Sequence, residues 1–95
     1  VMWRLLDGAN NKTALENAAD LKSAMDALPG SIPEILSFDV GINEIPSDAA
    51  CDISLYSTFE SYETLETYKA HPEHQKVVTF LQEITKERYV VDYED

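Results

Sequence analysis

Few residues in this sequence have the chemistry of an active site. His71 and His74 stand three positions apart, but Pro72 interrupts the backbone between them and no third ligand is evident, so no metal site is expected. Cys51 has no neighbouring base that would activate its thiol as a nucleophile. No glycine-rich phosphate loop and no Ser/His/Asp signature occurs, which argues against phosphoryl transfer and hydrolysis.

His74, Tyr68 and Asp92 each allow a chemical and a structural interpretation. His74 falls on the apolar stripe of a predicted helix, where a hydrogen-bonded core histidine is the common case and catalysis or ligand contact the alternative. A tyrosine near a helix end, such as Tyr68, commonly buries its ring and leaves its hydroxyl at the rim. Asp92 can pair with a strand neighbour, either Arg4 or Arg88.

Charge and composition narrow the classes of partner. The 95 residues carry 18 Asp and Glu against 7 Lys and Arg, a net charge of -11, and 44% of them are hydrophobic. A field of that sign repels phosphate backbones and anionic lipid headgroups, so neither nucleic acid nor a membrane surface is an expected partner. The length and the composition predict one globular domain over residues 1–95.

The single cysteine and the absence of a long apolar run bear on location. One cysteine allows no disulfide within the chain, which is typical of a reducing compartment, and no run approaches the roughly 20 apolar residues that span a bilayer. We therefore expect a cytoplasmic protein. Because the chain starts inside a predicted strand, a few residues can be missing before Val1.

The pattern of apolar residues predicts four strands and two helical connections. Alternation predicts strands over residues 1–6, 36–42, 53–59 and 88–93. Thr13 and Glu16 form a capping box for a helix that runs to Pro29-Gly30 with Asn17 on its wet side. Ser61 begins a second helix, which Pro72 interrupts and restarts. Leu36 is expected on the buried face of its strand.

This β-α-β-β-α-β order predicts an α+β, ferredoxin-like fold, a four-stranded antiparallel sheet with both helical connections on one face. The helices would cover six alternating strand residues: Trp3, Leu5, Phe38, Val40, Ile53 and Leu55. The other face would carry Met2, Arg4, Tyr56, Thr58 and Val90. That mixture is too apolar for a solvent face and too polar for a sealed core, which favours a partner sheet.

Five segments, in order and over essentially the whole chain, resemble the stress-responsive A/B barrel (Dabb) family. They are Val-Met-Trp-Arg-Leu at the start, Ile35 to Gly41, Phe59-Glu60-Ser61, Tyr68-Lys69-Ala70-His71-Pro72-Glu73-His74, and Val90-Val91-Asp92-Tyr93. The resemblance implies a homodimer in which two sheets pack face to face as a dimeric α+β barrel. The family mixes stress-induced proteins of unknown biochemistry with at least one plant polyketide cyclase.

The resemblance also implies roles for three residues. In the cyclase a tyrosine and a histidine at the positions of Tyr68 and His74 serve an aldol-type ring closure, in which an imidazole accepts a proton and a phenol stabilises the enolate oxygen. Asp92 matches an acidic residue that could orient one of them. The cyclase has bulky aromatic residues on its first helix, where this chain has small and aliphatic ones, so the substrate does not carry over.

Our leading expectation is a homodimer that binds a small, mostly apolar or phenolic molecule between helices and sheet, without a cofactor. Trp3, Leu55, Val78 and Leu81 are the predicted ligand-binding residues. One alternative is a cofactor-free enzyme, cyclase-like or monooxygenase-like, that uses His74 and Tyr68. The other is a non-catalytic, stress-protective dimer with a filled core.

Overall fold

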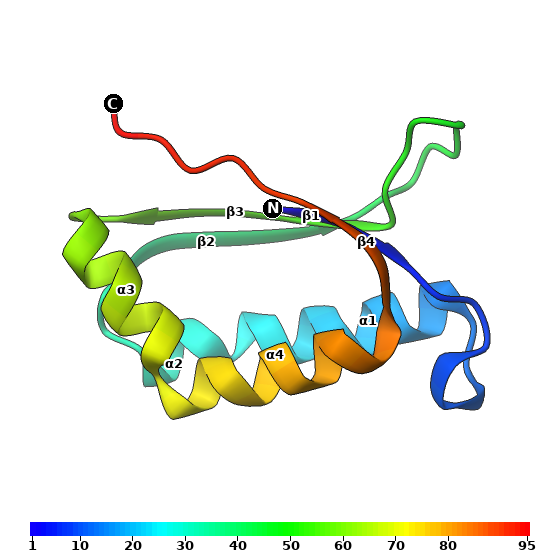
Figure 1. Cartoon of the computed structure of the whole chain (residues 1–95), viewed down its shortest axis with the longest axis horizontal. Coiled ribbons are helices and arrows are strands. Elements are labelled where there is room, and N and C mark those ends of the chain that lie inside the picture. Colours follow the sequence, from blue (N-terminus) through cyan, green and yellow to red (C-terminus); the bar gives the residue numbers. More distant parts are fainter.

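Four strands form one antiparallel sheet in the order β2-β3-β1-β4 in the computed structural model, which describes residues 1–95 (Figure 1). The strands are β1 (Met2–Leu5), β2 (Ile35–Ile42), β3 (Ile53–Phe59) and β4 (Thr85–Tyr89). The alternation of apolar residues therefore placed the first three strands correctly. The order of the elements confirms the predicted α+β, ferredoxin-like fold.

The helices lie on one face of this sheet (Figure 1). They are α1 (Ala14–Asp26), α2 (Leu28–Ser31), α3 (Tyr62–Ala70) and α4 (Pro72–Ile84), with a short 3-10 turn η1 (Ala9–Asn11) before them. The predicted capping box of α1 is present, since Thr13 accepts from the backbone of Glu16 and Glu16 accepts from that of Thr13. Ser61 caps α3 in the same way.

The core lies between the sheet and the helices. Five of the six predicted strand residues pack there as buried side chains, and the sixth, Phe38, is partly buried against them: Trp3, Leu5, Phe38, Val40, Ile53 and Leu55. The opposite side of the sheet, here called the open face, has no helix over it. Met2, Tyr56 and Tyr89 stand exposed on it, Tyr56 with 60% of its surface in solvent.

The last strand begins earlier than the sequence predicted. β4 starts at Thr85, directly after α4, and its pairing with β1 runs from Leu5↔Thr85 to Met2↔Tyr89. Residues 90–95, here called the C-terminal segment, make no backbone hydrogen bond, so the predicted strand over residues 88–93 was wrong for most of its length. A strand exists only where a neighbouring strand completes its hydrogen bonds, and periodicity within one segment does not report that neighbour.

Three local predictions were also wrong. Asn17 is fully buried rather than wet, because its amide donates to the carbonyl of Ala9 in the packed 3-10 turn at 2.9 Å. Leu36 is 65% exposed, because a register shift between Ile35 and Ser37 turns it outward. The first helix ends at Asp26, and the expected Pro-Gly stop instead forms α2, where proline suits the first turn.

No helix in the structure has the length and apolar character needed to cross a membrane.

Candidate functional site

Tyr68 and His74 meet in space at the junction of α3 and α4. Their ring centroids are 4.3 Å apart, and Tyr68 also packs against Phe59 of β3 at 4.9 Å and Phe38 of β2 at 6.1 Å. Residues from four elements thus form one aromatic cluster. The sequence predicted the first pair, and the structure adds the two phenylalanines that support it.

The backbone between the two helices sets the tautomer of His74. Nδ1 of His74 lies 3.0 Å from the carbonyl oxygen of Lys69. A carbonyl can only accept, so Nδ1 carries the hydrogen and donates it. The neutral ring then keeps a lone pair on Nε2, which is the atom that can accept a proton or a hydrogen bond.

The surroundings keep both rings uncharged near neutral pH. Burial lowers the pKa of His74 below its ordinary value of 6.5, partly offset by the hydrogen bond to Lys69, and the positive charges of Lys69 and Arg88 lower the pKa further. Burial raises the pKa of Tyr68 to about 12. Tyr68 is 6% exposed, and its hydroxyl makes no hydrogen bond within the chain but is not sealed from solvent.

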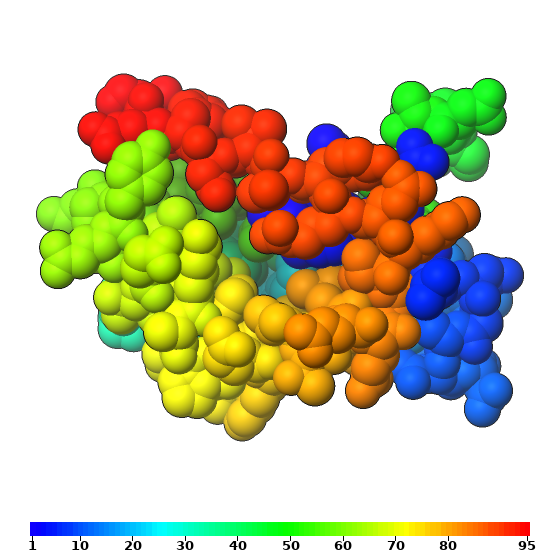
Figure 2. Space-filling model, in the orientation of Figure 1, coloured from blue at the N-terminus to red at the C-terminus, as the bar shows by residue number.

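A pocket of about 360 Å³ opens beside this cluster, between β3, the start of α3 and the C-terminal segment. Its apolar wall is formed by Leu55, Phe59 and Leu65, and Val91 and Tyr93 lie across from them. Figure 2 shows the C-terminal segment, in red, facing α3, in light green, across this hollow. We call it the β3 pocket.

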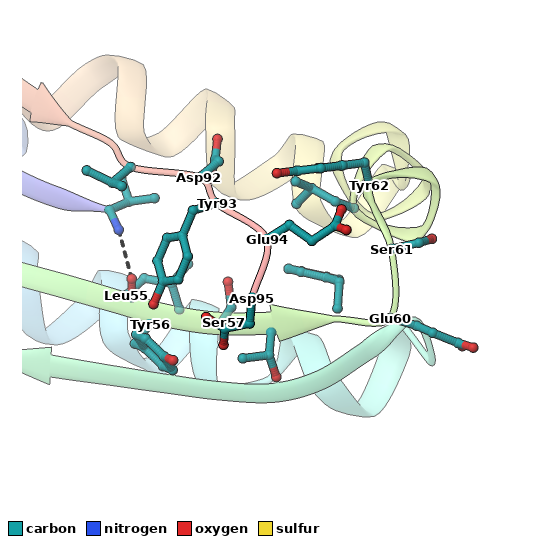
Figure 3. A pocket seen from close by; sticks show the side chains of 15 residues that line it. Leu55, Tyr56, Ser57, Glu60, Ser61, Tyr62, Asp92, Tyr93, Glu94 and Asp95 are labelled. Atoms are coloured by element: carbon teal, nitrogen blue, oxygen red, sulfur yellow. Dashed lines mark hydrogen bonds between the residues drawn. The ribbon is translucent and has the colours of Figure 1, made fainter.

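The rim of the β3 pocket is polar and acidic (Figure 3). Four acidic residues, Glu60, Asp92, Glu94 and Asp95, are among the lining residues, with the side chain of Glu60 directed outward, and the hydroxyl-bearing residues Ser57, Thr58 and Ser61 also line it. No lysine, arginine or histidine side chain lines the pocket. Its electrostatics therefore suit a neutral or positively charged guest better than an anion.

Phe59 connects the pocket to the predicted pair. It lines the β3 pocket on one side and contacts the Tyr68 ring on the other. Tyr68 and His74 themselves do not line the pocket. They lie one layer behind its wall, and opening the contact between Phe59 and Tyr68 would be needed to expose them to a guest.

Asp92 lies apart from the predicted pair. It lines the β3 pocket, forms no ion pair with His74, and belongs to the C-terminal segment (Figure 3). Neither Arg4 nor Arg88 pairs with it, since Arg4 instead meets Glu87 at 3.8 Å. The structure thus brings two of the three predicted catalytic residues together behind the wall of the β3 pocket and places the third in the lining of that pocket.

Only one of the four predicted ligand-binding residues lies at the β3 pocket. Leu55 lines the β3 pocket. Trp3 is a buried core residue, and Val78 and Leu81 of α4 are partly buried away from the pocket. Phe59 and Leu65 were missed, although the alternation along β3 places Phe59 on the same face as Leu55. Tyr93 was predicted as part of a strand over residues 88–93 and not as a pocket residue.

No group of three or more His, Cys, Asp or Glu side chains is placed to hold a metal ion.

The chain matches the model of a known domain family and is similar to solved structures. The model of the Stress responsive A/B Barrel Domain matches residues 1–95. A crystal structure of a dimeric protein of unknown function and ferredoxin-like fold from Bacteroides fragilis NCTC 9343 is similar, with 31% identity, a TM-score of 0.84, and coverage of 99% of this chain and 90% of that one. No curated protein matches the chain.

A second solved structure agrees in fold. It is a dimeric ferredoxin-like protein of unknown function from Thermobifida fusca YX, with a TM-score of 0.75. The identity is 16%, and the match covers 90% of this chain and 77% of that one. Both similar structures are therefore of proteins described as dimeric.

Proposed function

Because this chain belongs to the stress-responsive A/B barrel domain family, we propose that it acts as a homodimer whose protomers each bind a small, neutral, mostly apolar molecule between helices and sheet. The single observation that carries this proposal is the β3 pocket. Its volume of about 360 Å³ falls in the range of small-molecule sites, which is about 300–1,000 Å³. Its apolar wall and hydroxyl-lined rim suit a phenolic or similar guest.

Self-association is supported by two independent features. The similar protein from Bacteroides fragilis is dimeric at 31% identity. The open face also carries Met2, Tyr56 and Tyr89, large side chains that are between 45% and 60% exposed. A second copy would remove this surface from water, a gain of about 25 cal/mol for each Å² of apolar area.

A fluorescence titration with N-phenyl-1-naphthylamine, a neutral apolar dye, tests the pocket. We expect the wild type to bind the dye, and Ser57→Phe, which fills the pocket from β3, to bind it at least about tenfold more weakly. Ser23→Phe, on the exposed side of α1, is the matched control and should bind like the wild type. Equal binding by all three proteins would place the dye elsewhere. A wild type that binds no dye would favour the purely structural, stress-protective dimer.

A cofactor-free enzyme is the second candidate, and the geometry of His74 favours it. With Nδ1–H directed to Lys69, Nε2 is available as a base, and the Tyr68 phenol lies beside the same ring. General acid–base catalysis contributes about 10²- to 10⁴-fold in rate. If the protein cyclises linear poly-β-ketones, the turnover of His74→Ala should be at least about 100-fold lower than that of the wild type, while the dye still binds. Unchanged turnover would remove His74 from the chemistry.

A further inference from the structure

Both histidines of the chain lie at the break between α3 and α4, and each makes a hydrogen bond to the backbone there. Nδ1 of His71 accepts from the backbone N–H of Glu73 at 3.1 Å and so caps α4. A protonated imidazole has no lone pair left to accept with, so this cap exists only while His71 is neutral. Nδ1 of His74 instead donates to the carbonyl of Lys69 at 3.0 Å. The junction therefore depends on the protonation state of its own side chains.

The charged groups that face His74 oppose its protonation. Burial is the main reason that its pKa lies below 6.5, and the charges of Lys69 on α3, Arg88 on β4 and His71 at the junction lower the pKa further. Tyr68, whose ring contacts His74, supplies no negative charge, because burial raises its pKa to about 12. Both histidines also lie at the start of α4, where the helix dipole disfavours a cation.

No carboxylate offsets these positive charges. Neither histidine forms an ion pair, and the carboxylates on the adjoining turns are bonded to lysines, Glu66 to Lys69 at 3.4 Å and Glu73 to Lys76 at 2.9 Å. Protonating both imidazoles would therefore add two positive charges beside Lys69 with no partner to receive them.

The helix on the other side of the junction, α3, is weakly anchored. Of its nine residues only Tyr68 is buried, whereas α1 buries four residues and α4 buries two. A helix of this length is marginal by itself, so α3 depends on its tertiary contacts. Opening it exposes little of the core and costs less than unfolding the whole domain.

We propose that the junction is an acid-sensitive hinge, in which protonation of His71 and His74 releases α3 from α4 while the sheet, α1 and α4 stay folded. Protonation removes the cap at Glu73, and α3 moves away from the added charge and uncovers the Tyr68 ring. Because imidazole is the side chain that ordinarily titrates near pH 6.5, the hinge opens between about pH 6.5 and about pH 5. It needs no bound guest, so it goes beyond the proposed function.

Hydrogen exchange of the backbone amides tests the hinge, with each rate expressed as a protection factor that corrects for the intrinsic effect of pH. From about pH 7.5 to about pH 5.5 we expect the protection factors of α3 to fall at least about fivefold, the effect of losing one N-cap. At the lower pH they should be at least about tenfold below those of α1, because α3 opens by itself. The emission of Trp3, which is 4% exposed in the core, should not shift.

A double variant, His71→Asn with His74→Asn, removes both titrating groups. It keeps an acceptor toward Glu73 and a donor toward Lys69. We expect the protection factors of α3 in this variant to change by less than about twofold over the same pH range, because asparagine caps a helix without titrating. Should the double variant not fold, the two single variants give the test, since each should remove part of the pH dependence.

Three results would overturn the hinge. An equal pH dependence in the wild type and the double variant would show that other groups are responsible. Equal protection of α3 and α1 in acid, or a shift of the Trp3 emission to that of an exposed indole, would show that the domain unfolds as one unit. None of these outcomes bears on the proposed ligand binding, because the experiment contains no guest.

Discussion

His74 illustrates how a local hydrogen bond determines what a side chain can do. The ring lies against Tyr68, and its Nδ1–H is directed to the carbonyl of Lys69, so Nε2 is the basic atom. Burial disfavours the charged ring and lowers its pKa. The same arrangement serves a core histidine and a general base, which is why the type of residue alone could not distinguish the two roles.

The lowered pKa of His74 predicts a specific loss of stability in acid. The unfolded chain binds a proton to this ring near pH 6.5, whereas the folded chain resists it, so the contribution to the free energy of unfolding falls as the pH drops below about 6.5. When the pH is lowered from about 7.5 to about 5.5, the melting temperature of the wild type should fall further than that of His74→Asn, which keeps a donor toward Lys69. Equal losses in thermal melts of the two proteins would contradict the lowered pKa.

The contacts of Tyr68 predict that removing its ring destabilises the fold much more than removing its hydroxyl. Its hydroxyl has no partner in the chain while its ring contacts Phe38, Phe59 and His74. Tyr68→Phe should therefore change the free energy of unfolding by no more than about 0.5 kcal/mol, whereas Tyr68→Ala should cost about 3–5 kcal/mol. Urea denaturation measures both. A large cost for Tyr68→Phe would contradict the conclusion that the hydroxyl is unpaired within the chain.

At the scale of elements, the break between α3 and α4 positions the aromatic cluster. His71 ends α3 and caps α4, its Nδ1 accepting from the backbone of Glu73 at 3.1 Å, and Pro72 occupies the first turn. Because α3 ends there, the carbonyl of Lys69 is free to accept from His74 and from the side chain of Gln75. The cap of one helix and the tautomer of His74 are therefore parts of the same junction.

The cap at His71 can be tested by substitution. His71→Ala removes the acceptor for Glu73 and should cost about 1 kcal/mol of unfolding free energy, as for other N-caps. His71→Asn supplies an equivalent oxygen and should stay within about 0.5 kcal/mol of the wild type. Chemical denaturation compares the three proteins. If His71→Asn were as unstable as His71→Ala, the imidazole would act through packing and not through the cap.

The helices and the first three strands could be predicted because their signals are local. Alternation fixed the inward faces of β1 and β3, and Thr13 and Ser61 marked the helix starts. The extent of β4 could not be predicted, because it depends on which residues of β1 are opposite. Asn17 was misplaced for a similar reason, since its partner lies in the η1 turn.

The candidate site was predictable only in part. Tyr68 and His74 are on consecutive helices that meet at a proline, so their proximity follows from short-range spacing. The β3 pocket depends on how the C-terminal segment and the start of α3 lie beside β3, which is a tertiary fact. Leu55 was identified from its face of the strand, whereas the alternation that includes Tyr93 predicted a strand that the structure does not form at that residue.

At the scale of the whole molecule, the net charge disfavours association of two copies, whereas the exposed apolar side chains of the open face favour it. Each chain has a net charge of -11, so two copies repel, while the open face offers Met2, Tyr56 and Tyr89 for burial. A chain of 95 residues also buries a smaller share of its surface than a large domain does. The proposed association would therefore add stability that a single protomer lacks.

This opposition predicts that salt strengthens the dimer. Raising the ionic strength from about 0.01 M to about 0.15 M shortens the screening length from about 30 Å to about 8 Å and weakens the repulsion between protomers. The dimer dissociation constant, measured by sedimentation equilibrium, should fall several-fold over this range. A constant that rises with salt would indicate that ion pairs, and not apolar contacts, hold the protomers together.

Native mass spectrometry of the purified protein tests the central claim most directly, because it reports the number of subunits and any retained small molecule together. At micromolar concentration we expect twice the chain mass of 10.7 kDa, with additional mass from a neutral compound on each protomer when dye is added. A single 10.7 kDa species, unchanged by dye, would contradict both the paired sheets and the pocket.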